Sequence, residues 1–225
     1  MGVPAGTELL AHTARALTEH NPDLVLVALD ARNAYGTASR VDCLTALGQL
    51  APEVLPCAEL FCRRTSQYLF WDGAGECHRL TATNGVDQGD PLAPLLFACG
   101  LSPSLQRLEE QLQDLAEARG LARDSARVLA FLDDVALLLP PEIADQALPL
   151  SHATLREFGL ELALAKTQAW SRRSPCPPSL LPYWRASGLT LVGAPLGQPL
   201  PANGLPAENN ERRVDLAPED HAKQR

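Results

Sequence analysis

Basic residues are scarce in this chain of 225 residues, and lysine is nearly absent from it. Nineteen lysines and arginines stand against 27 acidic residues, so the formal net charge is −8 at pH 7. Only Lys166 and Lys223 are lysines. A protein that coats nucleic acid without specificity normally carries the opposite charge, so the composition argues against that class.

Long hydrophobic runs are missing as well. No apolar stretch approaches the roughly 20 residues that a membrane-spanning helix needs. The opening segment MGVPAGTELL lacks the basic stretch and apolar core of a secretory signal. We therefore expect an intracellular protein of the cytoplasm or nucleus that is neither secreted nor embedded in a membrane.

The six cysteines form no C-x-x-C pair, which is the usual mark of a zinc or redox site. Domains held together by disulfides are usually shorter than this chain and richer in cysteine. We expect reduced, structural thiols at Cys43, Cys57, Cys62, Cys77, Cys99 and Cys176.

The chain does contain enough hydrophobic sequence, 46 % of its residues, for one sizeable core. LVLVALD (24–30) has the pattern of a buried strand, and two β-prone runs around 72–75 predict a hairpin. A loop at 84–94 opens into a long helix, and short final strands are expected within 159–170 and 188–197. Because strands and helices do not alternate regularly, we predict an α+β fold, an antiparallel sheet with helices on one face.

Two adjacent carboxylates, Asp133 and Asp134, interrupt the apolar stretch VLAFLDDVALLLP (128–140), whose flanks suggest that the pair is buried. Aspartate is rarely buried unless it is paired or binds a metal, but it is also common in hairpin turns. Asp30 ends the first predicted strand and, taken alone, is best explained as a solvated strand end. If these strands are neighbours, three carboxylates meet at one edge, and Mg²⁺ would relieve their repulsion.

The loop GVDQGDPLAP (85–94) is the most specific motif of the chain. Gly85 and Gly89 permit close backbone approach, and the amide of Gln88 can both donate and accept hydrogen bonds. A plain turn before a helix would explain the glycines and prolines, but it would leave Gln88-Gly89 as an accident.

Taken in order, five segments resemble the successive palm motifs of reverse transcriptases, most of all those of non-LTR retrotransposons. They are LDARNAY (29–35), GVDQGDPLAP (85–94), FLDD (131–134), GLELALAKT (159–167) and LVGAPLG (191–197). The resemblance implies a right-hand polymerase palm and an RNA-directed DNA polymerase with two Mg²⁺ ions, for which Mn²⁺ can substitute. It also implies an RNA template, a DNA primer and deoxynucleoside triphosphates as partners.

Residue by residue, the resemblance makes Asp30, Asp133 and Asp134 the catalytic metal ligands, with the carbonyl of Ala31 as a further oxygen. Tyr35 matches the aromatic gate of the family, whose ring would clash with a ribose 2′-hydroxyl and so favours deoxynucleotides. An ordinary half-buried tyrosine at a helix start is the alternative.

Gln88 and Gly89 lie, by the same resemblance, beneath the incoming nucleotide and the template base. Lys166 matches a late lysine near the triphosphate, but a plain surface lysine explains it equally well. LVGAPLG resembles the turn that grips the primer strand. A palm-type nucleotidyl cyclase is disfavoured because it would not explain the Gln88-Gly89 loop.

The resemblance covers residues 24–197, which we assign to the palm. Residues 1–23 match only the last helix before the palm, a remnant of the fingers region, and 198–225 are expected to be a disordered tail. The basic fingers and the helical thumb of working relatives are thus expected to be largely missing. The alternative function is a truncated, catalytically inactive retroelement remnant with no enzymatic role.

Overall fold

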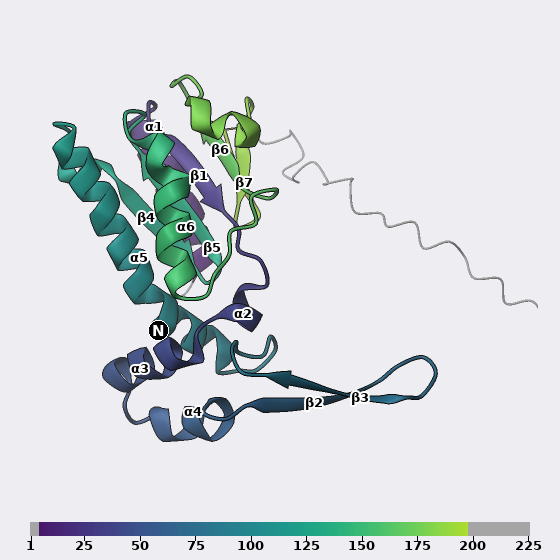
Figure 1. Ribbon diagram of the computed structural model, residues 1–225. Helices are drawn as coiled ribbons and strands as arrows, with labels where there is room; N and C mark the ends of the chain where they lie inside the picture. Colours follow the sequence, from purple (N-terminus) through teal and green to yellow (C-terminus); the bar gives the residue numbers. More distant parts are fainter. Residues whose placement is uncertain (1–4, 198–225) are drawn as a thin grey trace, which may run out of the picture.

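Residues 5–197 are described by the computed structural model (Figure 1), in which helices pack around a central antiparallel sheet. The first four residues and the predicted tail at 198–225 lie outside the described range. The helices are α1 (Gly6–His20), α2 (Ala34–Thr37), α3 (Arg40–Leu50), α4 (Leu55–Cys62), α5 (Ala93–Ala118) and α6 (Ala147–Glu157). The strands are β1 (Val25–Leu29), β2 (Ser66–Trp71), β3 (Cys77–Ala82), β4 (Arg127–Phe131), β5 (Asp134–Leu139), β6 (Gln168–Ser171), β7 (Leu189–Leu191) and β8 (Ala194–Leu196).

The central sheet has the strand order β4-β5-β1-β6, and each neighbouring pair is antiparallel. β1 lies inside the sheet, between β5 and β6, with Val25 opposite Leu139 and Leu29 opposite Val135. This position explains why the first predicted strand is an almost unbroken apolar run, because a central strand covered on both faces has no side exposed to water.

Alternating side chains of β1 and β5 supply two separate cores, one on each face of the sheet. Val27 and Leu137 join the larger core beneath α3, α5 and α6. Leu26 and Leu138 join a smaller core that contains residues of α1, β7 and β8. The predicted α+β fold with an antiparallel sheet is confirmed, and α1 with the β7–β8 hairpin adds a cover on the second face.

The long helix α5 follows the Gly- and Pro-rich loop, as the sequence predicts. Its buried residues Leu101, Leu108 and Leu112 recur at helical spacing and face α3 and α6. Within the described range, no helix combines the length and apolarity that crossing a membrane requires.

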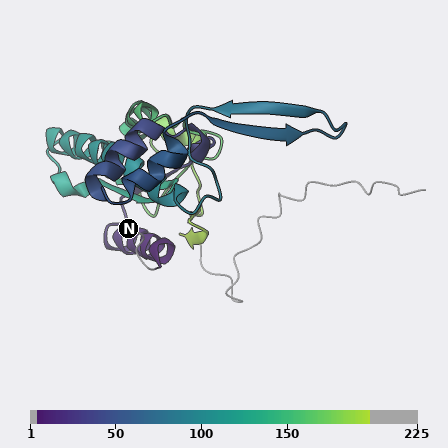
Figure 2. The ribbon, with the colours of Figure 1, turned by 90° about the horizontal axis from the view of Figure 1, so that it is seen from below.

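The hairpin formed by β2 and β3 leaves the body of the molecule and projects away from it (Figures 1 and 2). Its strands pair over their full length, from Ser66 opposite Ala82 to Trp71 opposite Cys77. The neighbours Phe70 and Trp71, which point to opposite faces, are 50 % and 59 % exposed, so the hairpin, unlike the central sheet, has no apolar layer on either face.

Candidate active site

Asp30 follows β1 directly, where that strand leaves the middle of the sheet. The register pairs Leu29 with Val135, so its continuation by one residue sets Asp30 opposite Asp134. The carbonyl of Asp30 accepts a hydrogen bond of 2.8 Å from the N–H of Ala163, which fixes the end of the strand. Like charges opposite each other on adjacent strands are unfavourable, so this arrangement favours a bound counter-charge.

Asp133 and Asp134 lie where β4 turns into β5. Phe131 pairs with Asp134, which leaves Leu132 and Asp133 as the two connecting residues. Leu132 has a φ of 55°, a costly backbone conformation for a bulky residue, which the tight two-residue turn imposes. Contrary to the expectation from their apolar flanks, both aspartates are exposed, and burial begins at Val135.

The carboxylates nevertheless act on one another. The pKa of Asp134 is raised, first because neighbouring groups withdraw its carboxyl from water, and then because of the charges on Asp133 and Asp30. The pKa of Tyr35 is also raised, by desolvation first and by Asp133 second. The ends of β1 and of the β4–β5 hairpin therefore share one negative electrostatic environment.

Lys166 supplies a positive charge to this environment. Its Nζ lies 3.4 Å from each carboxylate oxygen of Asp30. The lysine belongs to a turn, in which its N–H donates to the carbonyl of Ala163 at 2.8 Å, and β6 begins only at Gln168. The strand predicted within 159–170 is thus much shorter, because this turn interrupts it. The lysine side chain is 60 % exposed, and exposed ion pairs contribute little stability.

Tyr35 lies in the short helix α2, next to the end of β1. Its ring stacks on Phe97 of α5 with ring centroids 4.6 Å apart and an angle of 12° between the planes. Phe97 in turn meets Phe158 edge-on, at 5.9 Å between centroids. Tyr35, which is partly buried, therefore rests on an aromatic group that belongs to the main core.

The loop before α5 is joined to the Tyr35 segment by backbone hydrogen bonds. The N–H of Gly85 donates to Ala38, and the N–H of Val86 donates to Tyr35, each at 2.8 Å. Gly85 has a φ of +79°, and a Cβ there would lie 2.3 Å from the carbonyl oxygen of Gly36. Only glycine fits this close approach, so one of the two glycines singled out in the loop has a structural reason.

These segments enclose a cleft of about 470 Å³. Seven of the eight residues predicted from the sequence line it: Asp30, Ala31, Tyr35, Gln88, Gly89, Asp133 and Lys166. Asp134 is not among the lining residues. Asn33, which the sequence analysis missed, lines the cleft with a φ of 45°, a conformation that asparagine tolerates better than most residues. That preference of asparagine indicates a turn, but it does not indicate that the residue lines a cleft.

Residues that line this cleft carry oxygen donors of the kind that Mg²⁺ prefers, in the carboxylates of Asp30 and Asp133 and the carbonyl of Ala31. The carboxylate of Asp134, next to Asp133 in the chain, is a further donor outside the lining. The pKa of Asp134 is raised first by desolvation and then by the charges of Asp133 and Asp30, and this second contribution also suits a cation. Among residues 5–197, however, no three His, Cys, Asp or Glu side chains are gathered closely enough to hold a metal ion. The donors are of the chemical type that binds Mg²⁺, but in this structure they lie too far apart to bind one ion together.

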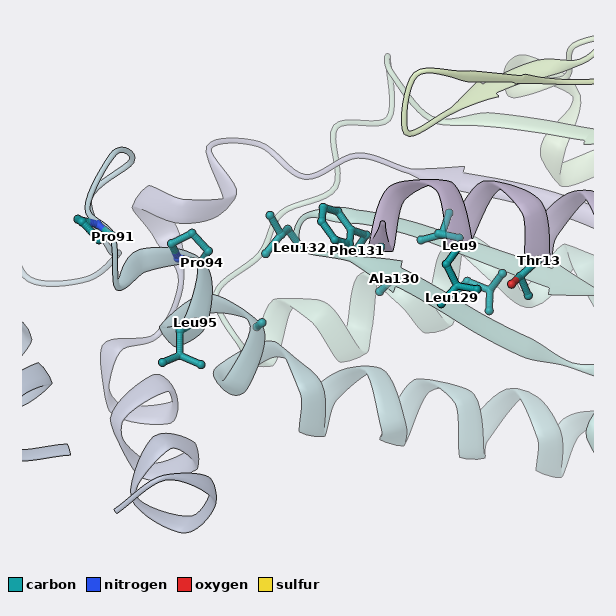
Figure 3. Close-up of a pocket in the computed structure, with 12 residues that line it drawn as sticks. Leu9, Thr13, Pro91, Pro94, Leu95, Leu129, Ala130, Phe131 and Leu132 are labelled. Carbon is teal, nitrogen blue, oxygen red and sulfur yellow. The ribbon is translucent and has the colours of Figure 1, made fainter. Parts of the chain in front are cut away.

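A second cavity, of about 630 Å³, lies behind the carboxylate hairpin and is lined mainly by apolar residues. Figure 3 shows Phe131 and Leu132 between the start of α5 on one side and Leu9 of α1 on the other. Pro94 lines both cavities. The hairpin that carries Asp133 thus has a polar cleft on one side and an apolar space on the other.

Telomerases are among the solved structures with a similar fold. A telomerase from Candida albicans, solved with a fragment of telomeric RNA, superposes with a TM-score of 0.58 at 15 % identity, over 85 % of this chain and 33 % of that one. An apo telomerase from Candida tropicalis gives 0.59 at 12 % identity, over 85 % and 34 %. At this identity the likeness establishes the fold alone, which is that of a polymerase palm.

Sequence comparison gives the family. Residues 1–196 match the family model for "Reverse transcriptase (RNA-dependent DNA polymerase)", and the chain belongs to the reverse transcriptase family. The predicted likeness to non-LTR retrotransposons is confirmed by curated relatives. The R2 Pol polyprotein of Nasonia vitripennis is 30 % identical over 172 residues, which is 72 % of this chain and 15 % of that protein.

Two further relatives agree. The SLACS 132 kDa protein of Trypanosoma brucei gambiense is 29 % identical over 64 % of this chain and 11 % of its own length. The R2 Pol polyprotein of Popillia japonica is 29 % identical over 74 % and 24 %. The chain therefore spans less than a quarter of each of these retroelement proteins and corresponds to their reverse transcriptase domain.

Proposed function

We propose that this domain catalyses RNA-directed DNA synthesis, in which a primer 3′-hydroxyl attacks the α-phosphorus of a deoxynucleoside triphosphate and pyrophosphate leaves. The observation that supports this is the cleft of about 470 Å³. It gathers seven predicted residues from four segments that are far apart in the sequence. A structural role for each residue separately would not require that they share one cavity.

The proposed roles follow from where the residues lie. Asp30, Asp133 and Asp134, with the carbonyl of Ala31, would hold two Mg²⁺ or Mn²⁺ ions. Bound there, the ions would stabilise charge on the attacking and leaving oxygens. The carboxylates lie at the ends of paired strands, and the rigid sheet limits their movement.

The remaining lining residues would bind the nucleotide. The Tyr35 ring, supported by Phe97, would exclude a ribose 2′-hydroxyl. Gln88 and Gly89 would lie beneath the base pair. The Lys166 ammonium, which contacts Asp30, would neutralise the triphosphate and donate a proton to the departing pyrophosphate.

The direct test is primer extension on an RNA template with deoxynucleoside triphosphates, in Mg²⁺ and separately in Mn²⁺. We expect extension that Asp133→Asn and Asp30→Asn each reduce about a hundredfold to a thousandfold. Glu142→Gln, a change far from the cleft, is the matched control. A ribonucleotide mixture should be used poorly by the native chain and better by Tyr35→Ala.

Absence of extension from folded protein in both metals would contradict the proposal for this chain. That result would favour the alternative of a catalytically inactive retroelement remnant. Extension that survives Asp133→Asn would instead point to a contaminating polymerase. Circular dichroism and a cooperative thermal transition establish that each variant is folded before it is assayed.

A further inference from the structure

Arg40, the first residue of α3, is only 6 % exposed although it carries a permanent charge. A buried guanidinium is costly unless its N–H groups are hydrogen-bonded, so the contacts of Arg40 need an explanation. None of the palm motifs identified in the sequence includes this residue, and it does not line the cleft.

Each of the three guanidinium nitrogens of Arg40 donates a hydrogen bond. Nε donates to the carbonyl of Gly85 at 2.5 Å, and Nη1 donates to the carbonyl of Arg64 at 2.9 Å. Nη2 donates to the hydroxyl of Ser66 at 3.0 Å. The acceptors belong to two separate places, the loop that leads to Gln88 and the root of the β2–β3 hairpin.

The positions of the three acceptors suit the planar guanidinium group of arginine. Arginine presents donors in fixed directions, whereas the ammonium of lysine is a single point with freely rotating hydrogens. Lysine at position 40 would keep the charge, but its single nitrogen could not reproduce the three bonds that Nε, Nη1 and Nη2 make in fixed directions.

The loop that Arg40 holds is also joined to the other wall of the cleft. Gly85 and Val86 bond to the backbone of Ala38 and Tyr35, and Gly85 lies against Gly36. Two residues beyond Val86, Gln88 lines the cleft, as Tyr35 does. The hydroxyl of Tyr68, in β2, donates to the carboxylate of Asp87 at 2.5 Å, a second link between the hairpin and this loop.

We propose that Arg40 is a positioning residue that fixes the Gln88-Gly89 loop and the root of the β2–β3 hairpin as one unit, and thereby sets the nucleotide side of the cleft. This rests on the proposed function of the cleft, but the coupling itself is a property of the folded chain. Arg40 acts through Gly85 and does not touch the reacting atoms.

The experiment is amide hydrogen exchange, followed by mass spectrometry, on the native chain and on Arg40→Lys. We expect exchange to rise about tenfold at 85–89 and 66–82, while peptides from β1 and β5 change less than about twofold. Arg64→Lys is the matched control, because Arg40 binds its backbone carbonyl while its own side chain is exposed. Ser66→Ala should loosen the hairpin root alone.

Unchanged exchange at 85–89 would overturn the proposal. An increase of equal size in β1 and β5 would also overturn it, because Arg40 would then stabilise the whole fold without positioning the loop. This readout does not depend on catalysis, so it stands even if the chain extends no primer. If the native chain does extend primers, Arg40→Lys should raise KM for the nucleotide by a larger factor than it lowers kcat. A fall in kcat as large as the rise in KM, or larger, would count against the proposal.

Discussion

The central sheet and the β2–β3 hairpin are both antiparallel and have strands of similar length, yet their side chains differ greatly in exposure to solvent. Leu137 and Leu138 in β5 are fully buried, whereas Leu69 and Trp71 in β2 are more than half exposed. Backbone pairing is complete in both. The difference lies in the layers: the sheet is covered by helices on one face and by α1 with β7–β8 on the other. The hairpin depends on contacts at its root.

Thiol reactivity should give the largest contrast between the two regions. Burial raises the pKa of Cys43, in α3 against the core, to about 12 from the usual 9.0, with smaller contributions from Asp42 and from the other thiols nearby. Three pKa units correspond to about a thousandfold less thiolate. At pH 8, we expect iodoacetamide to modify the exposed Cys77 of β3 at least about a thousandfold faster than Cys43. In urea the two rates should converge, and equal rates without urea would mean that α3 is not packed.

Truncation of leucine should separate the regions in stability. Leu137→Ala removes a fully buried side chain from between two packed layers, and we expect a loss of about 2–5 kcal/mol in the free energy of unfolding. Leu69→Ala, its matched control in the hairpin, should cost less than about 1 kcal/mol because the side chain is already exposed. Chemical denaturation of both variants measures this, and equal losses would show that the hairpin is covered in solution.

Replacing Gly85, in the loop that follows β3, should lower the free energy of unfolding more than replacing Gly73 at the tip of the hairpin. Gly85→Ala forces a Cβ against the Gly36 backbone at a φ of +79°, and we expect a cost of about 2 kcal/mol or more. A Cβ on Gly73 meets nothing within 4 Å, so Gly73→Ala should change stability by less than about 0.5 kcal/mol. Thermal unfolding compares the two, and a neutral Gly85→Ala would contradict the close approach of the loop.

Much of the fold could be predicted because its signals are local. The apolar run 24–29, the turn at 72–75 and the helical spacing after Pro94 each point to one element, and each element is present. The layer that α1 forms on the second face could not be predicted, because it depends on which elements meet in three dimensions. The turn around Lys166 likewise breaks a segment whose residues favour a strand.

The candidate site divides in the same way. Motif order identified seven cleft residues because each stands in a segment with its own pattern. The role of Arg40 could not be predicted, because a single arginine at the start of a helix forms no recognisable motif and its partners lie 24 to 45 residues away in the sequence. The exposure of Asp133 was also missed, because apolar neighbours along a strand do not show where the hairpin ends.

The smallest effect that we expect concerns the tip of the hairpin and depends on pH. The carboxylate of Asp72 contacts the His78 ring at 2.8 Å and accepts bonds from the N–H groups of Ala74 and Glu76. The contact with His78, followed by the backbone bonds, lowers the pKa of Asp72 from 3.8. A lowered folded-state pKa stabilises the tip at pH above about 4 and loses this contribution as the pH falls through the lowered value.

Amide exchange, corrected for its intrinsic pH dependence, should therefore show less protection at residues 74 and 76 near pH 2.5 than at pH 6, while β1 and β5 keep theirs. Asp72→Asn should remove the pH dependence, and Glu53→Gln, an exposed change outside the hairpin, should leave it intact. A tip whose protection does not vary with pH would mean that the turn at 72–75 holds itself without the carboxylate. The hairpin tip would then owe its protection to backbone pairing and not to this surface charge.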